Sequence, residues 1–255
     1  MKAVTAVRRK KSLWALHLAG NAALAAAIYQ WLWIPDRTVT DLALTAFAGL
    51  AIVALALWLH GGTLIYFRRE HQSGAATLGG AFRLAARRLP ALAVWALVVA
   101  FVGWAIMQLM NWQTPVSNWI ASWLTLRLRR PVRPDTVAWI YGWIVWFAAW
   151  VKWPFMLLPW AESALQNGFA AYRWSNLTRP LRTSMRPRYW LQFLTVFVIG
   201  AVIPALLVNW QPAVEGIRAE TASLVIRFLV AYVIAIAAWL VMASVLGAWG
   251  EREWE

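Results

Sequence analysis

The chain has 255 residues, of which 62% are hydrophobic and only 13% are charged, and its formal net charge is +14. A soluble domain carries about twice that share of charged residues, and one this apolar would expose large patches to water. The Lys and Arg residues lie at the ends of apolar stretches, which is a membrane pattern, so we expect no nucleic-acid partner. Because the chain has no cysteine, disulfides, thiolate catalysis and Cys-ligated metal centres are excluded.

Six mostly apolar stretches follow one another along the chain. Each is long enough to cross a hydrocarbon core about 30 Å thick as a helix, and only helices or closed barrels can cross it. The first stretch is too long for a signal peptide and has no small-residue cleavage site. The sequence therefore predicts an all-α polytopic transmembrane helix bundle, forming one integral membrane domain over 1–255. The predicted spans cover about residues 12–34, 41–66, 90–110, 136–158, 190–209 and 222–249.

The distribution of positive charge predicts the orientation of these spans. Sixteen Lys and Arg residues lie in segments 1–11, 67–89, 161–189 and the C-terminal tail, against six in the alternate connections. Under the positive-inside rule this asymmetry places both termini in the cytoplasm. We therefore expect a multi-pass protein of a bacterial cytoplasmic (inner) membrane. Within the fifth span, Gly200 and Pro204 predict a kink.

Two basic segments between spans, 77–92 and 177–191, repeat Leu and Arg at helical spacing. A shift of 99 residues superimposes their arginines, which predicts an internal repeat of span, basic interfacial helix and span; chance spacing of Leu and Arg is the alternative. Basic amphipathic helices are stabilised on an anionic leaflet, so we expect these arginines to contact lipid headgroups or a partner protein. The arginines concerned are Arg83, Arg87, Arg182 and Arg186. A third amphipathic segment, 116–130, is expected on the opposite surface, giving two or three interfacial helices.

Polar side chains within predicted spans are candidates for function. His17 and Asn21 lie one helical turn apart and are expected to be interhelical hydrogen-bond partners, with a proton relay as the alternative. Lys152 and Arg227 lie close enough to span ends for their charges to reach the interface. Glu162 is expected to form an ion pair with Lys152 or with an arginine of a neighbouring loop.

One segment shows a family resemblance. It reads L-P-W-A-E at 158–162, N-G-F-A-A-Y-R-W-S-N-L-T-R at 167–179 and R-P-R-Y-W-L-Q-F-L at 186–194. This resembles the six-span membrane domain associated with bacterial glycerophosphoryl diester phosphodiesterases and its stand-alone relatives, although Trp174 interrupts the Arg-Ser pair usual in that family. The matching positions are Pro159, Glu162, Gly168, Ala171, Arg173, Ser175 and Leu177. Because the phosphodiesterase chemistry of those proteins lies in a separate barrel, the resemblance implies a membrane domain without catalytic residues.

The sequence contains none of the common catalytic motifs. His17, His60 and His71 do not have metalloprotease spacing, and neither a P-loop nor a dinucleotide-binding glycine pattern is present. The ten acidic residues do not pair closely within a span, as a cation-dependent lipid enzyme would require. We therefore expect no enzymatic activity, no metal and no cofactor. The predicted function is contact with membrane lipid, a protein partner or a second copy through the basic segments; the alternative is a small permease or channel.

Overall fold

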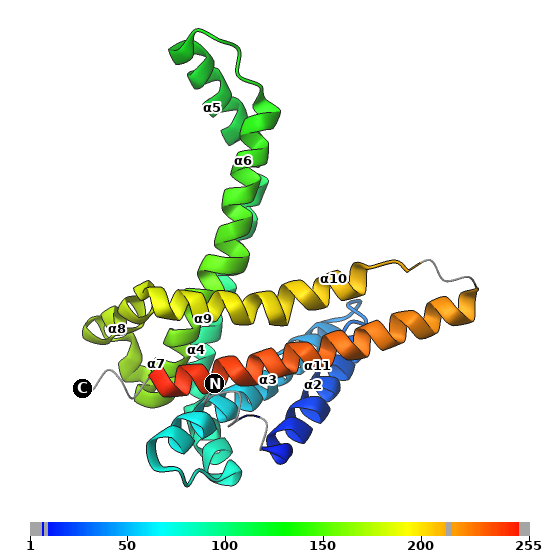
Figure 1. The fold of residues 1–255 in the computed structure, drawn as a ribbon, viewed down its shortest axis with the longest axis vertical. Coiled ribbons are helices and arrows are strands. Elements are labelled where there is room, and N and C mark those ends of the chain that lie inside the picture. The colour runs from blue at the N-terminus through cyan, green and yellow to red at the C-terminus, as the bar shows by residue number, and fades with distance from the viewer. Residues whose placement is uncertain (1–6, 8–9, 213–215, 250–255) are drawn as a thin grey trace.

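The computed structural model describes residue Val7, residues 10–212 and residues 216–249, and every regular element in these ranges is a helix (Figure 1). In chain order the elements are α2 (Lys11–Trp31), α3 (Val39–Ser73), α4 (Leu78–Asn111), α5 (Gln113–Leu128), α6 (Pro134–Phe147), η1 (Ala148–Lys152), α7 (Trp153–Asn167), η2 (Gly168–Tyr172), α8 (Trp174–Met185), α9 (Pro187–Phe197), η3 (Val198–Val202), α10 (Ile203–Asn209) and α11 (Ile217–Trp249). Six helical runs in the described part are long and apolar enough to cross a membrane, so the predicted all-α polytopic architecture is confirmed. Four of the basic residues counted for the predicted orientation lie outside the described residues: Lys2, Arg8, Arg9 and Arg252.

Helix α4 corrects the prediction for the first basic segment. It begins at Leu78, where the Thr77 hydroxyl accepts a hydrogen bond from the Gly80 amide at 3.3 Å, and it continues through Pro90 as one 34-residue helix. Proline in a helix interior removes one backbone hydrogen bond, and buried residues of α4 lie on both sides of Pro90, Phe82 before it and Leu92 after it. Before the proline, Phe82 is buried against Gly62 of α3, and a Cβ at Gly62 would lie 2.6 Å from the Phe82 ring. Residues 77–89 are therefore the first turns of a spanning helix and not a separate interfacial helix.

The second basic segment has a different local structure. Helix α8 ends at Met185, and Arg186 is extended, with φ −74° and ψ 128°, immediately before α9 begins at Pro187. Proline disfavours the helical conformation for the residue before it, which accounts for the break. The two segments that a 99-residue shift superimposes thus form one continuous helix in the first case and two helices in the second. The short helix α8 is amphipathic and accounts for one of the predicted non-spanning helices, whereas α5, which covers most of the predicted segment 116–130, has its apolar and polar residues spread around the axis.

Two spans contain a π-helical turn, and each turn is followed by a proline. Segment η1 ends two residues before Pro154, and η3 ends two residues before Pro204. A π-turn widens the helix and relieves the clash between a proline ring and the preceding turn. At the place of the kink predicted from Gly200 and Pro204 the structure has the π-helical turn η3, and the sequence analysis missed the second such turn, η1, which precedes Pro154.

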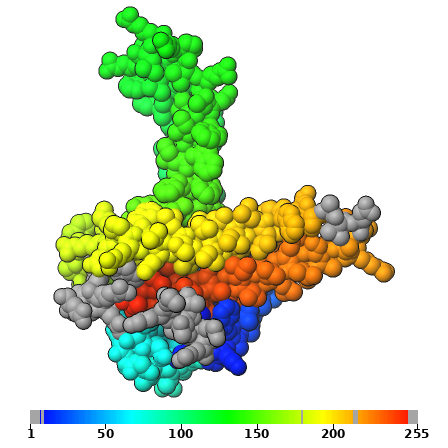
Figure 2. Space-filling model, in the orientation of Figure 1, coloured from blue at the N-terminus to red at the C-terminus, as the bar shows by residue number. Residues whose placement is uncertain are grey.

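Helix α3 is the centre of the packed part of the molecule, and it contacts α2, α4, α7 and α11. Helices α9 and α10 lie along α11, while the far half of α4 and helices α5 and α6 form an arm that stands away from the rest (Figures 1 and 2). The arm is joined internally by hydrogen bonds from Tyr141 to the Leu109 carbonyl at 2.7 Å and from Gln113 to the Ala138 carbonyl at 2.8 Å. Its exposed side chains include Phe101, Trp104, Trp139, Trp143 and Trp146. This apolar surface suits contact with lipid chains, and the overall arrangement is more open than a compact bundle.

Candidate functional site

The charged ends of several helices meet at one end of α3. Lys10, just before α2, donates a hydrogen bond to the Glu70 carboxylate at 2.7 Å, and this bond holds the pKa of Lys10 above its ordinary value. His71 is hydrogen-bonded to the Ser244 carbonyl at 3.1 Å and so joins α3 to α11. The start of α2, the end of α3 and the end of α11 are thus held together where the chain is most basic.

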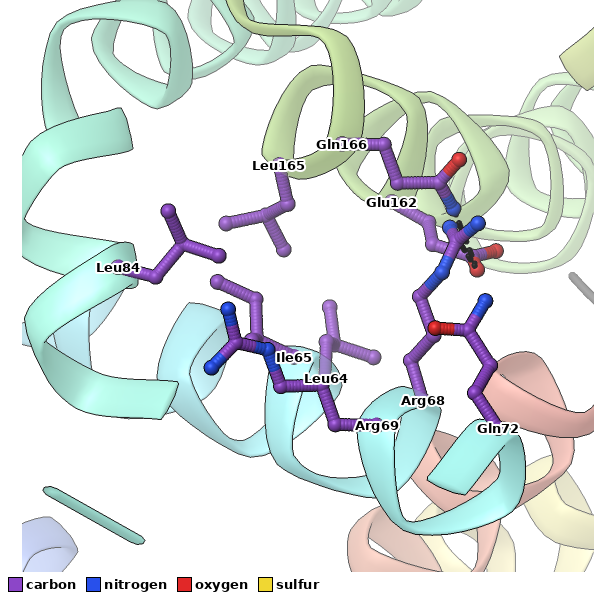
Figure 3. Close-up of a pocket in the computed structure, with 9 residues that line it drawn as sticks. All are labelled: Leu64, Ile65, Arg68, Arg69, Gln72, Leu84, Glu162, Leu165 and Gln166. Atoms are coloured by element: carbon purple, nitrogen blue, oxygen red, sulfur yellow. Dashed lines mark hydrogen bonds and ion pairs between the residues drawn. The ribbon is translucent and has the colours of Figure 1, made fainter. Parts of the chain in front are cut away.

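A cavity of about 240 Å³ lies between α3, α4 and α7 at this end, and we call it the polar pocket (Figure 3). Its lining residues are Leu64, Ile65, Arg68, Arg69, Gln72, Leu84, Glu162, Leu165 and Gln166. Figure 3 shows the Arg68 and Arg69 guanidinium groups on opposite sides of the pocket, Arg68 towards Glu162 and Arg69 towards Leu84. The pocket therefore combines an apolar floor with charged and amide side chains.

The ion pair between Arg68 and Glu162 orders one wall of the polar pocket. Arg68 Nη1 lies 3.4 Å from Glu162 Oε1, and Gln166 Nε2 donates to the same oxygen at 2.9 Å. The Arg68 and Glu162 side chains are only 16% and 12% exposed, so solvent screens their interaction weakly. Glu162 was expected to pair with Lys152 or with an arginine from a segment between spans. The structure shows the second alternative, with Arg68 at the end of α3 as the partner.

Arg69 gives the pocket its net positive charge. The charges of Arg68 and Glu162 offset each other, whereas Arg69 is exposed and forms no ion pair with any residue in the described ranges. The amides of Gln72 and Gln166 add hydrogen-bond donors without adding charge. A single anion matches this charge balance.

A second cavity of about 340 Å³ adjoins the polar pocket, and we call it the apolar pocket. The two pockets share Leu64 and Leu165. The apolar pocket is lined by Val53, Ala56, Leu57, His60, Gly61, Leu64, Leu92, Trp95, Leu158, Ala161, Leu165 and Trp239. Of its polar side-chain atoms, His60 Nδ1 and Trp239 Nε1 have no hydrogen-bond partner in the part of the chain that the structure describes. The linings of the two neighbouring pockets therefore change from charged to almost wholly apolar along α3.

Arg88 fixes the end of α7 beside these pockets. Arg88 Nη2 donates to the Gln166 carbonyl at 3.2 Å, where a cation interacts favourably with the negative end of the helix dipole. The next turn requires Gly168, whose φ is +58° and whose missing Cβ would overlap the Arg88 guanidinium. This is a physical reason for the glycine in the segment that resembles the phosphodiesterase-associated domain.

His17 and Asn21 link α2 to α3. His17 is fully buried, with Nε2 2.7 Å from the Thr63 hydroxyl, and Asn21 Nδ2 lies 3.1 Å from His17 Nδ1. Because the Thr63 hydroxyl donates its one hydrogen to the Leu59 carbonyl, His17 Nε2 must be the donor to Thr63. The ring is then fully hydrogen-bonded, an arrangement that suits helix packing.

Lys152 and Arg227 lie apart from the polar and apolar pockets, and Arg227 lines a separate cavity of about 450 Å³ with Gln211 and Glu220. Lys152 Nζ lies 5.1 Å from the centre of the Trp190 ring and 5.9 Å from that of Phe155, which are cation–π distances. Arg227 donates to the carbonyls of Val208, at 3.0 Å, and Trp210 at the end of α10. Lys152 therefore contacts α7 and α9, and Arg227 joins α11 to the end of α10.

The four arginines predicted to contact headgroups are all exposed. Arg83 and Arg87 lie on the first turns of α4, Arg182 lies near the end of α8, and Arg186 lies at the break before α9. The sequence analysis counted Arg68, Arg69 and Arg88 only as orientation signals and missed their place around the pocket. For Arg68 and Arg69, the sequence signal that could have been used is that two adjacent arginines directly follow the long apolar stretch of the second span.

No group of three or more His, Asp or Glu side chains that could hold a metal ion occurs among the described residues. A search against protein-family models, curated proteins and solved structures found no match to this chain.

Proposed function

We propose that this protein is a non-catalytic, multi-pass protein of a bacterial cytoplasmic membrane that binds anionic lipid through its basic helix ends. The observation that carries the proposal is the position of exposed Arg69, Arg83 and Arg87 on the adjoining ends of α3 and α4. A guanidinium can hold two phosphate oxygens at once, which a lysine ammonium does less well. Each basic residue near an anionic leaflet adds about 1 kcal/mol of attraction.

Two further observations support this function. The distribution of Lys and Arg along the chain favours a cytoplasmic location for these ends, where the leaflet is anionic. The resemblance of residues 158–194 to the phosphodiesterase-associated membrane domain favours a role without catalysis. Self-association or a protein partner at the same basic surface is compatible with lipid contact.

The test is the lipid that travels with the purified protein. The protein is extracted from membranes of mixed anionic and zwitterionic phospholipid, and the ratio of the two lipids retained is measured. The quadruple variant Arg83→Lys, Arg87→Lys, Arg182→Lys and Arg186→Lys keeps the charge and so the orientation signal. We expect it to fold normally and to retain less anionic lipid; equal retention would leave these arginines as orientation signals only.

A small permease is the second candidate function. It is favoured by the imidazoles of His17 and His60, which lie 5.5 Å apart between spans, with His60 also lining the apolar pocket. Ionisable side chains inside spans are typical of ion and proton pathways. Proton flux into liposomes that depends on these two histidines would favour the permease over the lipid-binding protein.

A further inference from the structure

We propose that the polar and apolar pockets together form a binding site for one anionic phospholipid, with its phosphate at Arg69 and one acyl chain in the apolar pocket. The inference rests on the proposed function and adds a defined site to it. The two pockets are neighbours that share Leu64 and Leu165 in their linings, and in this proposal the lipid passes over these two side chains from one pocket into the other. The site combines a cationic entrance with an apolar interior, which is the polarity of a phospholipid.

The length of the apolar pocket matches one leaflet. On α3 its lining runs from Val53 to Leu64, and at 1.5 Å per residue this is about 16 Å of helix. Half of a hydrocarbon core is about 15 Å. An acyl chain whose headgroup lies at Arg69 would therefore stay within its own leaflet.

The volume of the apolar pocket fits an acyl chain more closely than a helix. A volume of 340 Å³ spread over about 16 Å gives a cross-section of about 20 Å². A helix with its side chains is at least 10 Å wide, so its cross-section is about 80 Å². The enclosed volume therefore corresponds to a single acyl chain rather than to a helix of a partner protein.

The charge of the polar pocket favours an anionic headgroup. Glu162 offsets Arg68, so Arg69 supplies the excess charge, and its guanidinium lies on the side of the pocket next to Leu84 (Figure 3). A phosphate placed there would have the planar donor group of Arg69, with the amides of Gln72 and Gln166 also lining the pocket. A zwitterionic headgroup would bring its own cation next to the uncompensated charge of Arg69, which is unfavourable.

The experiment measures phospholipid bound to the full-length protein released from nanodiscs of phosphatidylglycerol and phosphatidylethanolamine, using native mass spectrometry. The double variant Ala56→Leu and Ala161→Leu fills the apolar pocket, and Arg69→Gln removes the excess charge. Ala46→Leu is the matched control, because Ala46 is exposed on the same helix α3. Retained secondary structure and an unchanged elution volume establish that each variant is folded.

We expect the wild type and Ala46→Leu to keep one phosphatidylglycerol, and both pocket variants to lose it by at least tenfold. Retention by the pocket-filling variant equal to the wild type would overturn the site, as would retention of phosphatidylethanolamine equal to that of phosphatidylglycerol. If the double variant Ala56→Leu and Ala161→Leu does not fold, Leu57→Phe replaces it, and we expect the same loss of bound phosphatidylglycerol. The wider enrichment of anionic lipid that depends on Arg83, Arg87, Arg182 and Arg186 is measured separately, so failure of this site leaves the proposed function standing.

Discussion

Gly247 of α11 lies directly against the backbone of α3 at Arg68. A Cβ on Gly247 would lie 2.8 Å from the Arg68 amide nitrogen and 3.0 Å from the Phe67 carbonyl carbon. Backbone atoms cannot move aside as the end of a side chain can, so the two helices approach this closely because residue 247 is glycine. The contact also fixes the last turns of α3, from which Arg68 and Arg69 reach the polar pocket.

Gly247→Ala should therefore destabilise the protein even though alanine is the better helix former. Overpacking of this kind costs about 1–3 kcal/mol. Gly103 of α4 has open space around it, so Gly103→Ala is the matched control and should be neutral or slightly stabilising. Unfolding free energies in one detergent compare the two variants, and equal effects would contradict the close approach.

Glu162→Gln and Arg68→Met should each destabilise the protein. The double variant should lose less free energy of unfolding than the sum of the two single losses. Each single change leaves a charge in a poorly exposed place without its main partner, which costs about 3 kcal/mol for a buried pair. A double-mutant cycle of unfolding free energies measures the coupling. Additive effects would mean that the 3.4 Å pair contributes nothing beyond its separate side chains.

Thr63→Val should destabilise the contact between α2 and α3, because it leaves the His17 Nε2–H without an acceptor in a buried place. The expected cost is about 1–3 kcal/mol. Thr63→Ser keeps the hydroxyl and is the control, with a smaller expected loss. If both variants unfold at the same denaturant concentration, the hydrogen bond between His17 and Thr63 does not stabilise the helix pair.

The bond between Lys10 and Glu70 should make a small contribution to stability that depends on pH. Because the pKa of Lys10 is raised in the folded protein, this contribution is fully present below the ordinary pKa of 10.5 and is lost as the pH rises through the folded value. Lys10 is 31% exposed, so the contribution is at most about 1 kcal/mol. Melting temperatures of the wild type and Lys10→Met should differ at neutral pH and converge above pH 10.5; a constant difference would argue against the bond.

The predicted orientation is tested by reporter fusions. Fusions after residues 10, 75 and 170 and at the C-terminus should report the cytoplasm, because these segments carry the excess of Lys and Arg. Fusions near residues 113 and 214 should report the opposite side. A signal from the far side at residue 75 or 170 would be incompatible with this orientation.

The spans could be predicted because each depends only on a local run of apolar residues. The boundary predicted at Pro90 was wrong, because α4 continues through the proline; Phe82 before it packs on Gly62 of α3, a tertiary contact that the local sequence does not reveal. The ion pair of Glu162 could be anticipated, since a poorly exposed acid needs a cation, but its partner is 94 residues away. The two pockets could not be anticipated, because they are spaces between helices whose relative placement leaves no periodic trace in the sequence.

The π-helical turns η1 and η3 have a consequence for helix register. Each turn holds about one residue more than an α-helical turn, so it displaces the downstream face by about 100° around the axis. Tyr189 and Phe193, one turn apart and buried before η3, therefore define an inward face that does not continue at the same spacing into α10. A relative with regular helices at these places would match this chain only with a one-residue gap within 148–152 and another within 198–202.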